Sequence, residues 1–75
     1  MNICIATISS LNLSIKAQKA LADERIFCKI ISLDPSMSKK GCAYGIEFAS
    51  SEERAVRKIL HRAGVYPSQF IQKRL

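Results

Sequence analysis

The chain has 75 residues and a mass of 8.4 kDa, which suffices for one hydrophobic core but not for two, so we expect a single domain over residues 1–75. Hydrophobic residues form 48% of the sequence, which excludes a disordered chain, and no apolar run approaches the roughly 20 residues of a membrane span. Twelve basic and six acidic residues give a net charge of +6, which favours anionic partners.

The N-terminus and the cysteines indicate the compartment. The first apolar stretch has no basic region before it and is broken by Ser9, Ser10 and Asn12, unlike a signal peptide. The chain has three cysteines, which are Cys4, Cys28 and Cys42. An odd number without a CxxC pair, and with a single histidine, builds neither a disulfide framework nor a four-ligand zinc site. We therefore expect a cytoplasmic protein without membrane contact, metal or cofactor.

The first half of the chain reads as strand, helix and strand. Residues 2–8 are rich in β-branched side chains and are too short for a helix, and Ser9 and Ser10 after them are good helix N-caps. The following helix is expected to end near Arg25, and its apolar stripe consists of Leu13, Ala17, Ala20 and Leu21. Residues 26–33 are again short and β-branched, and Asp34-Pro35 predicts a turn after this second strand.

The second half repeats the order strand, helix and strand. Residues 42–48 alternate, which places Cys42, Tyr44, Ile46 and Phe48 on one face. Ser50 and Glu53 have the spacing of a capping box. The helix that they open has a buried stripe of Ala55, Val56, Ile59, Leu60 and Ala63, and Gly64 is expected in the left-handed conformation that ends it. Residues 69–75 form the last predicted strand.

This order predicts an α+β fold of the ferredoxin-like, split βαβ type. In that arrangement right-handed connections put both helices on one face of a four-stranded antiparallel sheet and leave the other face uncovered. A site on the sheet is then expected on the uncovered face or along the edge where the first helix begins.

This topology places Cys42, at the start of the third strand, at the same end of the domain as the backbone amides that open the first helix. A helix N-terminus carries a partial charge of about +0.5, and basic side chains near a thiol also favour the thiolate. The predicted thiolate-stabilising residues are Ser9, Ser10, Lys39, Lys40 and Gly41. We therefore predict that Cys42 is the reactive thiol of the chain.

Each of these residues also has a purely structural interpretation. Cysteines in small domains often serve as small hydrophobic side chains, which we expect of Cys4 and Cys28 inside apolar strands and which stays open for Cys42. The lone His61 falls on the polar face of the second helix. Tyr44 and Phe48 are expected in the core or in a dimer contact rather than as platforms for stacked bases.

These features resemble the selenium/sulfur carrier-like family of small proteins, a domain of unknown function of about this length. Its members open with a strand that ends in a Ser/Thr-rich turn, continue into an Ala-Glu-Lys-Leu-Leu-like helix and carry a Cys after a Ser-rich loop. The counterparts are Ser9-Ser10, residues 17–21, and Cys42 after residues 36–41, with Gly64-Val65-Tyr66 similar to the closing Ala-Gly-Ile turn. The resemblance implies a persulfide or selenide held on Cys42.

Two positions depart from the family pattern. Asn12 stands where the family has a His at the opening of the first helix, and Ala43 follows Cys42 where the family has Gly. An asparagine donates hydrogen bonds but takes no proton at neutral pH, so no base is expected beside Cys42.

Two classes of function follow. In the first, the chain is a non-enzymatic sulfur or selenium carrier or thiol-redox protein, and Lys39 and Lys40 attract an acidic donor or acceptor protein. In the second, it is a binding or regulatory module with Cys42 structural, acting as a homodimer through the uncovered sheet face, through another protein, or through weak nucleic-acid binding. The Lys/Arg-Gly-Phe signature of common RNA-binding domains is absent from residues 42–48.

Overall fold

The structure, a computed structural model, describes residues 2–34, 36 and 43–74. Its elements, in chain order, are β1 (Asn2–Ile8), α1 (Leu11–Asp23), β2 (Lys29–Ser32), β3 (Tyr44–Ala49), the 3-10 turn η2 (Ser50–Glu52), α2 (Glu53–Ala63) and β4 (Phe70–Arg74). The predicted order of elements is confirmed, although β2 is shorter than the apolar run 26–33 that predicted it.

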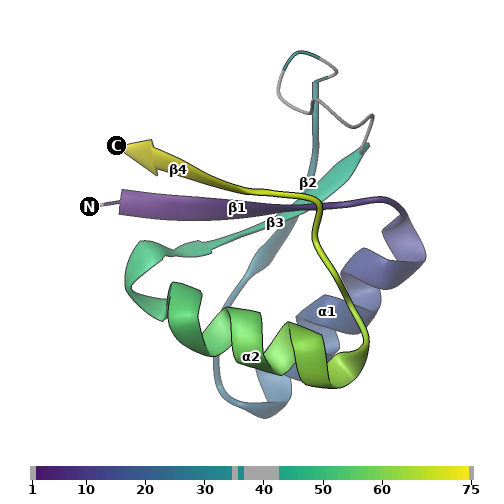
Figure 1. Cartoon of the computed structure of the whole chain (residues 1–75), viewed down its shortest axis with the longest axis vertical. Helices are drawn as coiled ribbons and strands as arrows, with labels where there is room; N and C mark the ends of the chain where they lie inside the picture. Colours follow the sequence, from purple (N-terminus) through teal and green to yellow (C-terminus); the bar gives the residue numbers. More distant parts are fainter. Residues whose placement is uncertain (1, 35, 37–42, 75) are drawn as a thin grey trace.

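The four strands form one antiparallel sheet in the order β2-β3-β1-β4. Figure 1 shows β1 beside β4, with β3 crossing behind them toward β2. Four antiparallel strands with two helices confirm the predicted α+β class. Because β1 and β3 are the two inner strands, the segments 2–8 and 44–49 determine where every other element lies.

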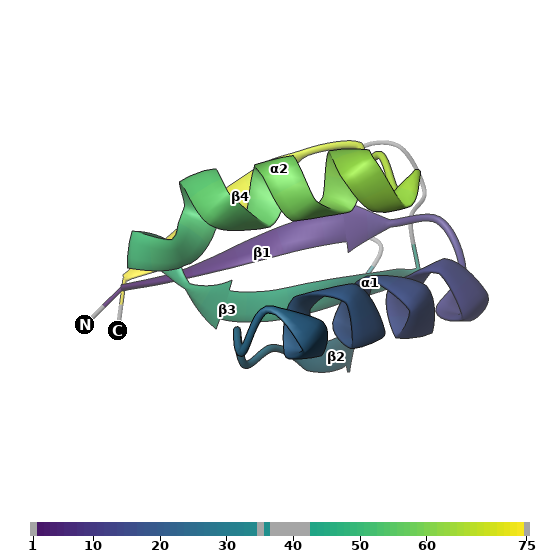
Figure 2. The same ribbon diagram turned by 90° about the horizontal axis from the view of Figure 1, so that it is seen from below.

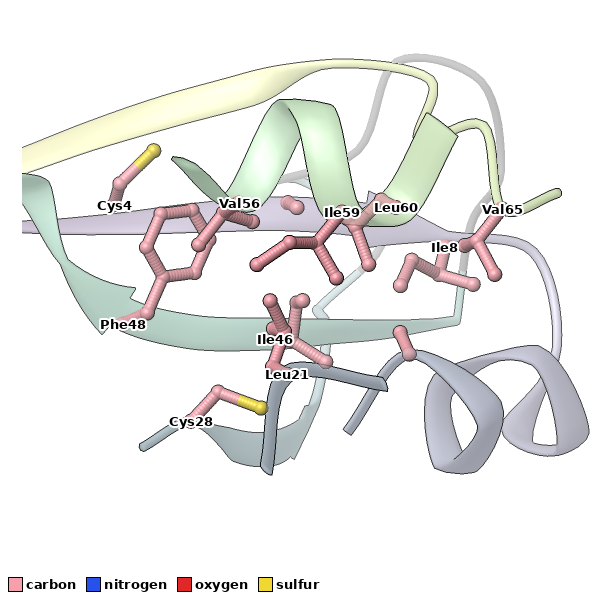
Figure 3. Packing of buried hydrophobic residues seen from close by; sticks show 12 residues of the cluster. Cys4, Ile8, Leu21, Cys28, Ile46, Phe48, Val56, Ile59, Leu60 and Val65 are labelled. Carbon is pink, nitrogen blue, oxygen red and sulfur yellow. The ribbon is translucent and has the colours of Figure 1, made fainter. Parts of the chain in front are cut away.

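Both helices pack on the same face of this sheet, below β1 and β4 in Figure 1. Alternate residues of the two inner strands point into the layer between sheet and helices, as the period of two requires. The buried cluster of this layer is Cys4, Ala6, Ile8, Ala17, Leu21, Cys28, Ile46, Phe48, Val56, Ile59, Leu60 and Val65. Figure 3 shows these side chains filling the space between the helices and the strands.

No helix covers the second face in the part of the chain that the structure describes, yet this face is not bare. Ile5 is 1% exposed and Leu33 8% exposed there, with Ile31 and Ile71 packed against them. Gly45 makes this packing fit, because a Cβ at that position would lie 3.1 Å from the carbonyl oxygen of Ala6 and 3.1 Å from Cγ2 of Ile5. The central apolar residues of the uncovered face are thus buried by one another.

The two helices end in the same way with different residues. In α2, Gly64 has φ 80°, its amide donates to His61 and the amide of Val65 donates to Leu60, which is the predicted left-handed ending. In α1, Arg25 has φ 61° and Ile26 donates to Leu21. An arginine in this conformation carries a steric cost that a glycine lacks, and nothing in the local sequence predicts it.

Several local predictions are wrong in detail. Leu13 is partly exposed, and Ser14 is the residue buried between Ser10 and the stripe of Ala17 and Leu21. The capping box is also absent: Ser50 begins η2 rather than capping α2, and the N-cap of α2 has no side-chain hydrogen bond. The turn at Asp34 is confirmed, since its carboxylate accepts the amide and hydroxyl of Ser36 at 3.0 and 3.1 Å.

Neither of the helices described has the length and apolar character needed to cross a membrane.

Candidate functional site

The end of β1, the start of β3 and the first turn of α1 lie together at one end of the sheet. Ile8 pairs with Tyr44 as the last pair of the β1–β3 ladder, and the amide of Leu33 donates to the carbonyl of Ala43 at 2.8 Å. Figure 2 shows these three segments at the opposite end from the two chain termini. The predicted juxtaposition of helix opening and third strand is therefore confirmed for residues 43 and 44.

Ser10 organises the helix opening at this end. Its hydroxyl accepts the amide of Leu13 at 3.2 Å, and its carbonyl accepts the amide and the hydroxyl of Ser14 at 3.1 and 3.0 Å. The first amides of a helix have no intrahelical acceptor. Within the described segments this leaves the amides of Leu11 and Asn12 without a protein acceptor.

The structure refines the predicted roles of the two serines. The hydroxyl of Ser10 is occupied as the N-cap, and Ser9 is exposed between β1 and the helix. The groups available to an anion are the backbone amides of Leu11 and Asn12, two residues after the predicted Ser9 and Ser10. Asn12 is exposed on the first turn of α1. The other predicted site residues, Cys42, Lys39, Lys40 and Gly41, lie outside the described residues.

Cys4 has a different environment near the other end of β1. It is fully buried, its thiol lies 3.7 Å from Oε1 of Glu53, and the amide nitrogen of Gln72 lies 3.6 Å from its sulfur. Burial, and then the negative charge of Glu53, raise the pKa of the Cys4 thiol to about 11. A thiol with that pKa is protonated at neutral pH, so Cys4 has little nucleophilic character.

Cys28 is also a packing residue. It is 5% exposed, and burial raises the pKa of its thiol. Gln18 of α1 donates to its carbonyl at 3.4 Å and holds the segment before β2 against the helix. Figure 3 shows Cys4 and Cys28 at the margins of the buried cluster. The prediction that both are buried, structural thiols is confirmed by their burial.

A polar cluster around Glu53 joins α2 to β4 and was missed by sequence reasoning. Arg57 Nε donates to the carboxylate of Glu53 at 2.9 Å, Gln72 donates to its other oxygen, and Ser50 donates to Gln72 at 2.7 Å. Arg57 also stacks on Phe70, 3.9 Å from the ring centroid. These hydrogen bonds, with that from Arg57 the largest, lower the pKa of Glu53. The only local signal is the i, i+4 spacing of Glu53 and Arg57.

The remaining candidates from the sequence belong to packing or to the surface. Phe48 is buried against the helices, with Tyr44 and Phe70 on the same face of the strands, so the strand aromatics do not lie on the uncovered face. His61 is exposed, with its ring 5.5 Å from that of Tyr66. Among the described residues, no three His, Cys, Asp or Glu side chains come together as a metal site.

Comparison with known proteins adds one finding. A family model described as "Putative Se/S carrier protein-like" matches residues 3–72. The match therefore includes all of β1 except Asn2, β3, both helices and the segment around Cys42. No curated protein matches the chain.

Proposed function

We propose, from the premise that this chain belongs to the Se/S carrier protein-like family, that it carries sulfur or selenium on the thiolate of Cys42. The observation that supports this most is the end of the sheet where Ile8 pairs with Tyr44 and α1 begins. Cys42 is the residue before Ala43, whose carbonyl accepts the amide of Leu33 at this end of the sheet.

The local electrostatics suit an anion. The amides of Leu11 and Asn12 lie at the positive end of a 13-residue helix whose first turn has no acidic residue. Lys39 and Lys40 are close in sequence and add positive charge. Both effects lower a thiol pKa from its ordinary value near 8.5, which increases the thiolate fraction at neutral pH.

The chemistry of loading is a displacement at sulfur. The Cys42 thiolate attacks the outer sulfur of a donor persulfide, a new S–S bond forms, and the bond within the donor persulfide breaks. The donor leaves as a thiolate that takes up a proton from water. Transfer to an acceptor thiolate is the same reaction in the opposite sense. No oxidant is consumed, and no base beside the cysteine is needed once the thiolate is present.

We further infer that the fold is of the ferredoxin-like type. The strand order supports this, because β3 lies between β1 and β2 while β1 lies between β3 and β4, as in two interleaved split βαβ units. A carrier of this size acts without an enzyme activity of its own, in the cytoplasm, and meets its donor and acceptor through its basic surface. An acidic partner protein fits the net charge of +6.

Weak nucleic-acid binding is the less supported function. RNA-binding sheets of this class stack bases on exposed aromatic side chains. On the uncovered face of this sheet the strands carry Ile5, Ile31 and Ile71, and the strand aromatics are on the helix side. We therefore propose only a salt-sensitive association through charge, which disappears at physiological salt.

Mass analysis of the intact protein after incubation with glutathione persulfide tests the carrier proposal. We expect the mass to increase by one sulfur atom, with the adduct on the peptide that contains Cys42 and lost on treatment with a reductant. Cys42→Ser should take up no sulfur, whereas the matched variant Cys28→Ala should react like the wild type. Sulfur on Cys4 or Cys28, or no adduct at all, would contradict the proposal.

A further inference from the structure

Among the residues that the structure describes, the most exposed large hydrophobic side chain is that of Phe27, which is 87% exposed in the segment between α1 and β2. An exposed phenylalanine is costly in water, and single exposed aromatic residues beside a groove are typical anchors of protein interfaces. Phe27 is flanked by two such grooves: one of about 400 Å³ reaches toward β3, and one of about 280 Å³ reaches toward α1. Neither groove includes the helix opening proposed to hold the Cys42 thiolate.

The larger groove has an apolar floor and two rims of opposite charge. Its apolar lining is Ile3, Ile26, Phe27, Phe48 and Ala49. On the side of the edge strand β2, the lining includes Arg25 and Lys29, whereas β3 and η2 contribute Glu47 and Glu52. Lys29 and Glu47 stand opposite each other in the β2–β3 ladder, so the boundary between the rims runs along this pair of strands.

We propose that this groove is the contact surface of a homodimer in which each copy inserts Phe27 into the groove of the other. A surface that offers both an exposed aromatic ring and an apolar recess next to it is self-complementary under two-fold symmetry. With the two-fold axis parallel to the boundary between the rims, the basic rim of one copy lies against the acidic rim of its partner. A groove whose rims carried charges of one sign would repel the same groove on a second copy. This groove avoids that repulsion because its lining has two basic and two acidic residues.

This surface is one end of the uncovered sheet face that the sequence suggested for a dimer, because Lys29 pairs with Glu47, Glu47 pairs with Ile5, and paired residues share a face. At the centre of that face Ile5 and Leu33 are already buried within one copy, which leaves less apolar area to be gained there by association. At the Phe27 groove, by contrast, a phenylalanine ring is still in water. The net charge of +6 repels two copies at long range, but this repulsion is screened beyond about 8 Å at physiological ionic strength.

Sedimentation equilibrium of the full chain at physiological salt tests the proposal. We expect a monomer–dimer equilibrium in the micromolar range, and Phe27→Ala should raise the dissociation constant by about 30-fold, as for loss of an interface anchor. Tyr66→Ala is the matched control, because Tyr66 is another exposed aromatic residue, 69% exposed, remote from this groove. It should leave the equilibrium unchanged. A monomer at all concentrations would overturn the proposal.

Charge reversal gives a test that does not depend on removing the aromatic ring. The variant with Glu47→Lys and Glu52→Lys, and the variant with Arg25→Glu and Lys29→Glu, should each be monomeric because their rims repel. Mixed in equal amounts, the two variants should form a heterodimer, since each former contact again joins opposite charges. Circular dichroism verifies that both are folded. A dimer that survives these reversals, or one that is lost only with Ile71→Ser, at the centre of the uncovered face and outside the groove lining, would also overturn the proposal.

Discussion

The two ends of the sheet treat a thiol in opposite ways. Near one end, Cys4 is buried beside the carboxylate of Glu53, and its pKa rises to about 11. At the other end, β1 stops, α1 begins, and the amides of Leu11 and Asn12 lie at a positive helix terminus. From this difference we expect the reactivity of a thiol in this small domain to depend on its position along the strands.

The largest expected contrast between the two ends is in alkylation rate. At pH 8 a thiol with a pKa of about 11 is roughly one-thousandth thiolate, and burial slows it further. We predict that iodoacetamide labels Cys42 at least about 100-fold faster than Cys4 or Cys28 under native conditions. Timed labelling with peptide mapping measures the three rates. Labelling of Cys4 or Cys28 at a rate equal to or above that of Cys42 would contradict this prediction.

The helix opening should depend on Ser10 and not on Ser9. Ser10→Ala removes the acceptor of the Leu13 amide and is expected to lower the free energy of unfolding by about 1 kcal/mol. Ser9→Ala changes an exposed residue outside the cap, so its effect should stay within about 0.5 kcal/mol. Urea denaturation of the two variants gives both values. Equal losses would show that the cap is not what orders this end.

The positive charges of the two lysines before Cys42 should lower the pKa of its thiol. Replacing Lys39 and Lys40 with Ala is predicted to raise the pKa of the Cys42 thiol by about half a unit and to slow its alkylation at pH 7 about threefold. The double variant with Lys73→Ala and Arg74→Ala loses the same net charge at the opposite end of the sheet, and should not change the rate. An unchanged thiol pKa in the first variant would leave the helix terminus as the sole source of activation.

The smallest effect concerns the pH dependence of stability at the Cys4 end. Because folding raises the thiol pKa from 9.0 to about 11, the unfolded chain loses its proton first, and stability falls as pH rises across this interval. Glu53→Gln removes a charge that raises this pKa, so the loss of stability should still begin near pH 9.0 but end at a lower pH and be smaller in total. Denaturation at several values between about pH 8 and 11 measures this loss of stability in the wild type and in Glu53→Gln. Glu24→Gln is the control.

At low pH the ionisation of Glu53 itself makes stability rise with pH, which is opposite to the effect of Cys4 at high pH. Its folded pKa lies below the ordinary 4.5, so its contribution to stability is present above that value and is lost as the carboxylate is protonated through the lower folded pKa. The same acid titration in Glu53→Gln should lack this component. An identical acid profile in the variant and the wild type would mean that the Glu53 cluster does not couple to folding.

The two helix ends show what local sequence can and cannot predict. Gly64 was predicted because glycine is the residue that enters the left-handed conformation without a steric cost. Arg25 adopts the same conformation without any such signal, since the packing of Ile26 against the core imposes it. The wrong capping box has a similar cause: Ser50 and Glu53 have the spacing of a cap, but both donate or accept toward Gln72 on β4 instead.

The sequence by itself determined the order of the elements, a helix N-cap at Ser9 or Ser10 and the burial of Cys4 and Cys28, because strand alternation, helical periodicity and capping depend on residues a few positions apart. Only the tertiary structure decided that Leu33 closes over Gly45, that Glu53 meets Gln72, and that Phe27 is left in water. Such contacts depend on strand register and on loop closure between distant segments, and no periodicity within one element specifies them.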